Sequence, residues 1–186
     1  MDDRTKAQVK AFTKWVNLHL RASNVTISDI TEDFKDGRSL AKLTSELTGG
    51  TRIKTRKVKG GAKLMCLDNI NASFTVLREH VKLVNIGPLD IFNGNVKLIL
   101  GLVWTMILRF EVEEIEIDGI SGKKGLLLWC QRVTESYDNV NITNFDKSWR
   151  DGLGFNAIIH HFRPDLIDYE SLGSDARENA ANAFDV

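Results

Sequence analysis

Hydrophobic residues recur along much of the chain at steps of three and four, the spacing that places them on one face of a helix. Residues 5–21 show this pattern, with basic residues on the opposite face and Leu18 outside the apolar stripe. The stripe consists of Val9, Phe12, Val16 and Leu20, joined by Trp15 and His19. A second helix is predicted to carry Leu40, Leu43 and Leu47 and to end near Gly49-Gly50, and a third to cover about 64–82.

The most apolar stretch covers residues 98–108 and is interrupted only twice. It is too short to cross a bilayer, which takes roughly 18–20 apolar residues. We therefore predict a helix over about 95–110 that is surrounded by other helices, because a helix that is apolar on nearly all sides must be covered. The preceding Asn93-Gly94-Asn95 is typical of a turn followed by a helix cap. These patterns predict an all-α fold.

The chain contains an internal repeat. A shift of 115 residues places Asp36-Gly37 on Asp151-Gly152, together with the apolar positions around them, and a shift of 114 places Trp15 on Trp129. One inserted residue reconciles the two shifts, so that about 35 consecutive positions share one pattern. We predict two copies of one helical unit, residues 1–110 and residues 122–186, joined by an acidic linker over 111–121.

The second copy is shorter than the first. The repeat aligns Val186 with Val76, so 34 residues of the first copy, including the central helix, have no counterpart. The apolar faces that carry Trp129 and Phe155 would then lack their main packing partner. Exposing even about 500 Å² of apolar surface would cost on the order of 12 kcal/mol, as much as the whole stability of a domain. On this reasoning we expect a piece of a longer chain with an incomplete second domain.

Charge is divided unevenly between the two copies. Residues 1–110 hold 18 Lys and Arg against 10 Asp and Glu, a net of +8, whereas residues 111–186 hold 7 against 15, a net of −8. This asymmetry favours an acidic partner for the first copy, although surface charge also drifts without function. Residues 1–6 lack the apolar core of a secretory signal, so we expect a cytoplasmic protein. Cys66 and Cys130 lack metal-ligand spacing and are predicted to be small core residues.

No catalytic site is recognisable in the sequence. Gly152-Leu-Gly154-Phe-Asn-Ala157 fits a dinucleotide-binding pattern by letter, but no apolar strand precedes it. His160 and His161 are adjacent and would project about 100° apart on a helix, unlike zinc ligands spaced by four. Asp36 and Asp151 fit helix starts rather than a catalytic pair. We predict no enzyme activity, no cofactor and no metal site.

Two segments are candidates for partner contacts. Residues 51–63 carry six cations and indicate an exposed loop, which either is simply solvated or touches phosphates or an acidic protein. The loop has no interleaved aromatic residues, so we predict no nucleic-acid partner. The second segment, 81–89, holds more apolar surface than a short turn needs and is a candidate partner patch.

Motifs in both copies resemble the calponin homology (CH) domain family. In the first copy these are Phe12-Thr-Lys-Trp-Val-Asn-Leu-His-Leu-Arg21, Asp33-Phe-Lys-Asp-Gly37 and Asn93-Gly-Asn-Val-Lys-Leu98. In the second copy they are Gly125-Leu-Leu-Leu-Trp-Cys-Gln-Arg132 and Ser148-Trp-Arg-Asp-Gly-Leu-Gly-Phe-Asn-Ala157. The copies look most similar to the alpha-actinin type within the spectrin and filamin superfamily. The resemblance covers nearly the whole chain and implies two CH bundles that bind F-actin, the second without its C-terminal helices.

The resemblance also implies which residues touch actin. They lie on the first helix, in the run 81–102 and on the first helix of the second copy. The implied contacts are Lys10, Thr13, Lys14, Asn17, Leu18, Arg21, Val81, Lys82, Leu83, Val84, Leu89, Lys97, Leu98, Leu102, Lys123, Lys124 and Gln131. Phe12 and Trp15 are expected to support the core instead. Most contacts lie in the cationic copy, so we expect binding mainly through it.

Further expectations come from the same resemblance. Relatives of alpha-actinin type are often regulated by a phosphoinositide, for which Lys147, Trp149 and Arg150 are the candidates here, although Asp138 stands where a lysine is common. The family places Trp104 between the two domains. The parent protein is expected to belong to the actin cytoskeleton, to crosslink filaments and to be a homodimer through regions outside this sequence. The alternative is a CH adaptor for microtubules or signalling proteins.

Overall fold

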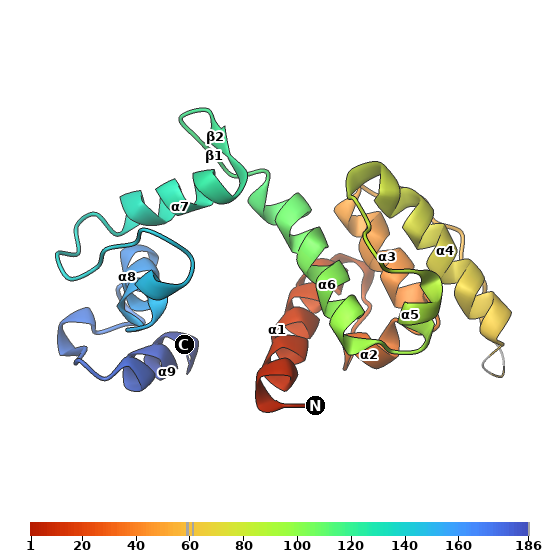
Figure 1. Ribbon diagram of the computed structural model, residues 1–186, viewed down its shortest axis with the longest axis horizontal. Coiled ribbons are helices and arrows are strands. Elements are labelled where there is room, and N and C mark those ends of the chain that lie inside the picture. The colour runs from red at the N-terminus through yellow and green to blue at the C-terminus, as the bar shows by residue number, and fades with distance from the viewer. Residues whose placement is uncertain (59, 61, 186) are drawn as a thin grey trace. The chain divides into compact units, whose positions relative to one another are not determined.

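The computed structural model describes residues 1–58, 60 and 62–185 (Figure 1). Lys59 and Gly61 of the predicted basic loop, and Val186 of the predicted repeat, lie outside the described residues. By contacts the chain divides into two compact units, Met1–Glu111 and Val112–Val186, called the first and second unit below. Both units are mostly helical, as predicted.

The first unit is built from six α-helices among its described residues. They are α1 (Asp3–Leu20), α2 (Ile30–Asp33), α3 (Arg38–Leu47), α4 (Lys63–His80), α5 (Pro88–Phe92) and α6 (Val96–Ile107). A single 3₁₀ turn, η1 (Arg21–Ser23), follows α1, and a π-helical turn, η2 (Leu108–Val112), follows α6. The periodicity predicted α1, α3, α4 and α6 to within a few residues. It missed the short helices α2 and α5. The N-cap of α2, Asp29, accepts a hydrogen bond from Thr31 N at 2.6 Å.

The centre of the first unit is α6, as the apolar stretch predicted. Ile99, Val103 and Met106 are fully buried, and Figure 1 shows α6 lying alongside α1. The helix begins where expected, because Gly94 adopts a φ of 68° and the Asn95 side chain accepts from Leu98 N at 3.4 Å. Core residues from α1, α3 and α4 pack around this helix in one cluster. The apolar residues that recur at helical spacing in the sequence therefore form one shared core.

The second unit contains three helices and one small hairpin among its described residues. The helices are α7 (Gly122–Val133), α8 (Leu153–Phe162) and α9 (Ala176–Asp185), with 3₁₀ turns η3 (Lys147–Trp149) and η4 (Tyr169–Ser171). Strands β1 (Glu116–Ile117) and β2 (Ile120–Ser121) pair antiparallel, inside the segment expected to be a plain linker. Asp118 and Gly119 between them have φ of 53° and 76°, the left-handed values that a tight hairpin turn requires. The hairpin is a small local addition, and the prediction of an all-α fold is confirmed by two units that are mostly helical.

Apolar side chains of the second unit are covered less completely than those of the first. Trp129 stacks on Phe162 at 5.9 Å between ring centroids, but Phe162 is itself 57% exposed. Phe155 is half-buried and touches Phe184, which is 71% exposed. The faces that the repeat predicted to lack a partner are thus partly open to solvent within the described residues. Cys66 and Cys130, by contrast, are buried in their units as predicted, and burial raises the pKa of both thiols.

A glycine and an asparagine join α3 to α4 in the first unit. Gly37 precedes α3 with a φ of 76°, and a Cβ at this position would lie 2.6 Å from Ile70 N on α4. Asn69, which is 2% exposed, donates to Asp36 O at 2.9 Å and to Arg56 O at 3.0 Å, and accepts from Arg56 N at 2.7 Å. The absence of a side chain at Gly37 lets α4 approach α3 closely. Asn69 can therefore form hydrogen bonds with the backbone of Asp36 and Arg56.

The second unit repeats the arrangement. Gly152 precedes α8 with a φ of 77°, and its Cβ would lie 2.7 Å from Ala180 N on α9. Asn179 donates to Asp151 O at 2.9 Å and to Gly173 O at 3.0 Å. The Asp151 carboxylate accepts from Leu153 N at 3.0 Å, so it starts its helix as predicted. The sequence repeat therefore reflects a repeated helix-crossing device.

Candidate functional site

Helix α1 buries one face and presents a mixed basic and apolar face to solvent. Its N-cap, Asp2, accepts from Thr5 N at 2.8 Å. Lys10 and Lys14 are exposed, and Leu18 is 54% exposed, as its position outside the apolar stripe predicted. The sides of α1 between these faces hold half-buried aromatic residues that pack on the core, among them Phe12 and Trp15.

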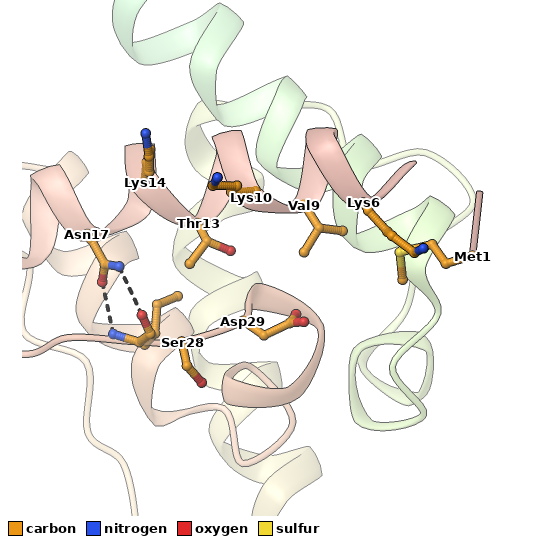
Figure 2. A pocket seen from close by; sticks show the side chains of 10 residues that line it. Met1, Lys6, Val9, Lys10, Thr13, Lys14, Asn17, Ser28 and Asp29 are labelled. Carbon is orange, nitrogen blue, oxygen red and sulfur yellow. Dashed lines mark hydrogen bonds between the residues drawn. The ribbon is translucent and has the colours of Figure 1, made fainter. Parts of the chain in front are cut away.

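A hollow of about 420 Å³ lies between α1 and residues 27–29 (Figure 2). Asn17 closes one end, because its amide nitrogen donates to Ile27 O and its amide oxygen accepts from Ile27 N, both at 2.9 Å. Thr13 Oγ1 accepts from Ile30 N at 3.3 Å. Figure 2 shows Thr13 and Asn17 facing residues 27–29, whereas Lys14 points away from them. The polar side chains on this side of α1 therefore hold the fold together.

Burial corrects three of the implied contacts. Thr13 is 8% exposed, Val81 is 7% exposed and Leu102 is 2% exposed. The Thr13 hydroxyl accepts a hydrogen bond from Ile30 N at the start of α2. The side chains of Val81 and Leu102 belong to the core cluster. None of the three offers its side chain to a partner in this structure.

The segment before α5 carries exposed apolar side chains. Val84 is 59% exposed, Leu89 is 47% exposed and Lys82 is exposed, whereas Leu83 and Ile86 are half-buried against the core. The apolar patch predicted for residues 81–89 is therefore smaller than expected and is centred on two side chains. On the first turns of α6, Lys97 is exposed and Leu98 is half-buried.

Trp104 lies on the outer side of α6. Its ring stacks on Phe12 of α1 with 6.4 Å between centroids and an interplanar angle of 5°, and half of the residue's surface stays exposed. A large aromatic residue that is half-exposed on an otherwise buried helix is an unusual feature. Its expected place between the domains stays a prediction.

Five exposed cations of the first unit that the resemblance implies as actin contacts are not neutralised by a neighbouring carboxylate that the structure describes. Among the described residues, no ion pair involves Lys10, Lys14, Arg21, Lys82 or Lys97. Elsewhere in the unit cations do pair, as in Lys6 with Asp3 at 3.1 Å and Lys35 with Glu32 at 2.6 Å. Unpaired surface cations create an attractive field for an anionic partner, and this field weakens with salt.

Helix α7 carries the candidate contacts of the second unit. Lys123, Lys124 and Gln131 are exposed, and Lys123 Nζ lies 5.7 Å from the centroid of the Phe145 ring. The amide of Gln131 donates to Ile142 O at 2.8 Å, as Asn17 does to Ile27 in the first unit. The sequence analysis does not predict this shared role. The repeat nevertheless aligns Asn17 with Gln131 and Ile27 with Ile142.

Comparison with known families decides what kind of chain carries these features. The model of the calponin homology (CH) domain matches residues 6–112 and again residues 120–186. The chain belongs to the calponin homology family. The match to both parts confirms that the repeat is a pair of CH domains.

Relatives of this CH pair are large proteins. It is 47% identical over 193 residues to the erythrocytic spectrin beta chain of Mus musculus and 48% identical to the spectrin beta chain of Drosophila melanogaster, covering all of this chain but 9% and 8% of theirs. It is 46% identical over 183 residues to alpha-actinin-1 of Homo sapiens, covering 97% of this chain and 20% of that protein. The chain thus spans at most a fifth of these relatives.

A solved structure shares the fold. The actin-crosslinking core of fimbrin from Schizosaccharomyces pombe superimposes with a TM-score of 0.74 at 19% identity, over 98% of this chain and 41% of that one. At this identity the likeness concerns the fold alone. Among the described residues, no helix of the CH pair is long and apolar enough to cross a membrane.

The lipid candidates of the second CH domain are mostly engaged within it. Arg150 pairs with Asp146 at 3.0 Å, and Trp149 Nε1 donates to Asn144 O at 2.8 Å. Of the three candidates, Lys147 is the one cation that forms no ion pair with a described residue. A phosphoinositide contact at this turn stays a prediction, with one cation rather than two to support it.

Proposed function

We propose that this CH pair is a non-catalytic module of the cytoskeleton that binds F-actin, mainly through its first unit. Support comes from similarity to spectrin beta chains and alpha-actinin-1 across nearly the whole chain. The fimbrin fragment that shares the fold is described as an actin-crosslinking core.

The observation that carries the proposal is the combination of unpaired cations and exposed apolar side chains on the first unit. Lys14 and Leu18 lie one turn apart on α1, and Val84 and Leu89 are further exposed apolar side chains of the same unit. Cations speed the encounter with an acidic filament, and apolar side chains supply contact area that water leaves on binding. Leu98, Leu83 and Gln131 are half-buried or engaged, so we assign them smaller shares of the contact.

Co-sedimentation with F-actin across a salt series tests the proposal. We expect Lys14→Glu with Leu18→Glu to weaken binding by about tenfold or more, because a repulsive charge replaces an attractive one and a carboxylate replaces an apolar contact. The matched control is Lys57→Glu with Leu64→Glu, since Lys57 is exposed on a loop and Leu64 is 73% exposed on α4. Equal loss in both double variants would leave only a nonspecific charge effect and refute the proposal.

A second pair of variants tests the greater share of the first unit. Lys10→Glu with Lys14→Glu changes α1 by the same charge as Lys123→Glu with Lys124→Glu changes α7, and all four lysines are exposed. We expect the α1 pair to cost more F-actin affinity than the α7 pair. The reverse order would move the main contact to the second unit.

The competing function is a CH adaptor for microtubules or signalling proteins. The same pelleting assay with microtubules separates the two, because the actin proposal predicts saturable binding to F-actin and none to microtubules. Pelleting with microtubules, together with failure to pellet with F-actin, would replace the proposed function by this alternative.

A further inference from the structure

A second basic feature of the first unit lies between α3 and the loop that follows it. Two adjoining hollows of about 300 Å³ and 400 Å³ share Arg38, Lys42 and Thr55 in their walls. Arg52 lines the larger one from the loop side. The two hollows, which share these wall residues, are together called the α3 cleft below. None of its residues is among the actin contacts proposed above.

The lining of the α3 cleft has a net positive charge, with three cations against one carboxylate. Arg38, Lys42 and Arg52 are all exposed, and among the described residues neither arginine forms an ion pair. Lys42 is partly neutralised by Glu46 at 3.3 Å. One carboxylate, Asp36, lines the smaller hollow and accepts from the backbone N of Arg38 at 2.8 Å.

The loop wall of the cleft is held in place before any ligand arrives. The buried Asn69 side chain binds both the backbone N–H and the backbone C=O of Arg56, at 2.7 and 3.0 Å. At the other end, Gly50 N donates to Ser45 O at 2.8 Å and Thr51 Oγ1 donates to Thr48 O at 3.0 Å. A wall fixed at both ends gives a cleft that loses little conformational entropy on binding.

The second unit shows that the fold does not demand this charge. Its corresponding loop, anchored by Asn179, holds Asp165, Asp168, Glu170 and Asp175 against the single cation Arg163. The same scaffold therefore carries opposite charge in the two units, and the basic residues of the α3 cleft are a property of this site alone.

We propose that the α3 cleft binds a ligand with clustered phosphate groups. Arginine guanidinium groups match phosphate oxygens with paired hydrogen bonds, and Arg38 of α3 and Arg52 of the loop both line the larger hollow. Ser45 and Thr55 place hydroxyl groups in the same lining. A phosphate monoester carries nearly two negative charges at neutral pH, which a carboxylate side chain does not. The chemistry is shared by a soluble polyphosphate and by a phosphorylated lipid headgroup.

Calorimetric titration of the full chain with tripolyphosphate tests the site. We expect Arg38→Gln with Arg52→Gln to weaken binding by about tenfold or more, since each arginine supplies charge-assisted hydrogen bonds. The matched control is Lys54→Gln with Lys57→Gln, which removes the same charge from exposed positions of the same loop outside the cleft lining. We expect the control to lose less than about threefold. Equal losses, or no binding by the unmodified chain, would overturn the proposal.

Two further arms identify the source of the phosphate and the class of ligand. We compare binding to vesicles that contain a bisphosphorylated inositol lipid with binding to phosphatidylserine vesicles of equal charge. Stronger binding to the inositol lipid would identify a lipid headgroup as the ligand, and equal or weaker binding would identify a soluble polyphosphate. Displacement of tripolyphosphate by polyglutamate at similar concentration would mark a site for acidic peptides and overturn the phosphate proposal. We expect the Arg38→Gln, Arg52→Gln variant to keep wild-type affinity for F-actin. Loss of phosphate binding and loss of F-actin binding can therefore be measured separately.

Discussion

Replacing Gly37 by alanine tests the close approach of α3 and α4. A Cβ at Gly37 would lie 2.6 Å from Ile70 N and 2.6 Å from Asn69 Cβ, distances at which the two helices must move apart. Gly49 is the matched control, because its φ of 69° is similar to the 76° of Gly37 but nothing lies within 4 Å of its would-be Cβ. The difference between the two variants therefore isolates the steric term.

The magnitudes follow from three contributions. A left-handed alanine costs about 1–2 kcal/mol, and the loss of glycine's freedom in the unfolded chain returns about 0.4–1 kcal/mol. Gly49→Ala should thus destabilise the first unit by roughly 0.5–1 kcal/mol. Gly37→Ala adds overpacking of about 1–3 kcal/mol against a backbone that cannot rotate aside. We expect a difference of about 1–3 kcal/mol between the variants.

Urea denaturation combined with hydrogen exchange of α4 peptides measures this difference in the correct unit. Exchange resolves the first unit from the second, which matters because a two-unit chain need not unfold in one step. Gly152→Ala supplies the same perturbation in the second unit, where the Cβ would lie 2.7 Å from Ala180 N. If Gly37→Ala and Gly49→Ala agree to within about 0.5 kcal/mol, the helices are not in the tight contact described here.

Two other predictions concern polar side chains that form hydrogen bonds with the backbone. Partial burial would raise the pKa of Asp33, but hydrogen bonds from two backbone N–H groups and a serine hydroxyl outweigh it and hold the pKa below its ordinary value. That stability is present above the ordinary carboxyl pKa and is lost as pH falls through the lowered one, so urea midpoints measured from pH 7 to pH 2 should decline less steeply in Asp33→Asn. Asn17→Ala should destabilise the first unit by about 2–3 kcal/mol, since it breaks two hydrogen bonds to one backbone residue, and Gln131→Ala the second unit by about 1 kcal/mol, since it breaks one. Loss of F-actin affinity without loss of stability in Asn17→Ala would instead mark a direct contact.

Periodicity predicted the helices of the first unit because their burial is one-sided and regular. The stripe of α1 and the apolar run of α6 are long enough for the period to show. The short elements escaped for the opposite reason. Helix α2 spans four residues, about one helical turn, and each strand of the hairpin spans two, so neither is long enough for its period to repeat. The hairpin has a local signal in Asp118-Gly119, but the acidic composition of residues 111–121 by itself predicts only a linker.

The site was harder to predict, because a sequence shows where a residue falls on a helix but not what its side chain bonds to. Lys14 and Leu18 were placed correctly on the outside of α1 by the helical period alone. Thr13 and Asn17 lie at the edge of the apolar face, where a polar side chain either meets solvent or satisfies a neighbouring backbone. Both side chains form hydrogen bonds with the backbone of residues 27–30. The sequence does not predict these bonds, because residues 27–30 belong to a connector without a regular hydrophobic period.

The duplication separates what the fold needs from what function can change. The glycine before the second main helix, the asparagine that crosses to it and the amide on the first helix are kept in both units, because each satisfies or avoids a backbone atom. Exposed positions have diverged, from a net of +8 over residues 1–110 to −8 over residues 111–186. Surface charge costs the fold little, since exposed ion pairs contribute less than about 1 kcal/mol each. Two copies of one scaffold can therefore carry opposite surfaces, and the proposed function assigns the acidic filament to the cationic copy.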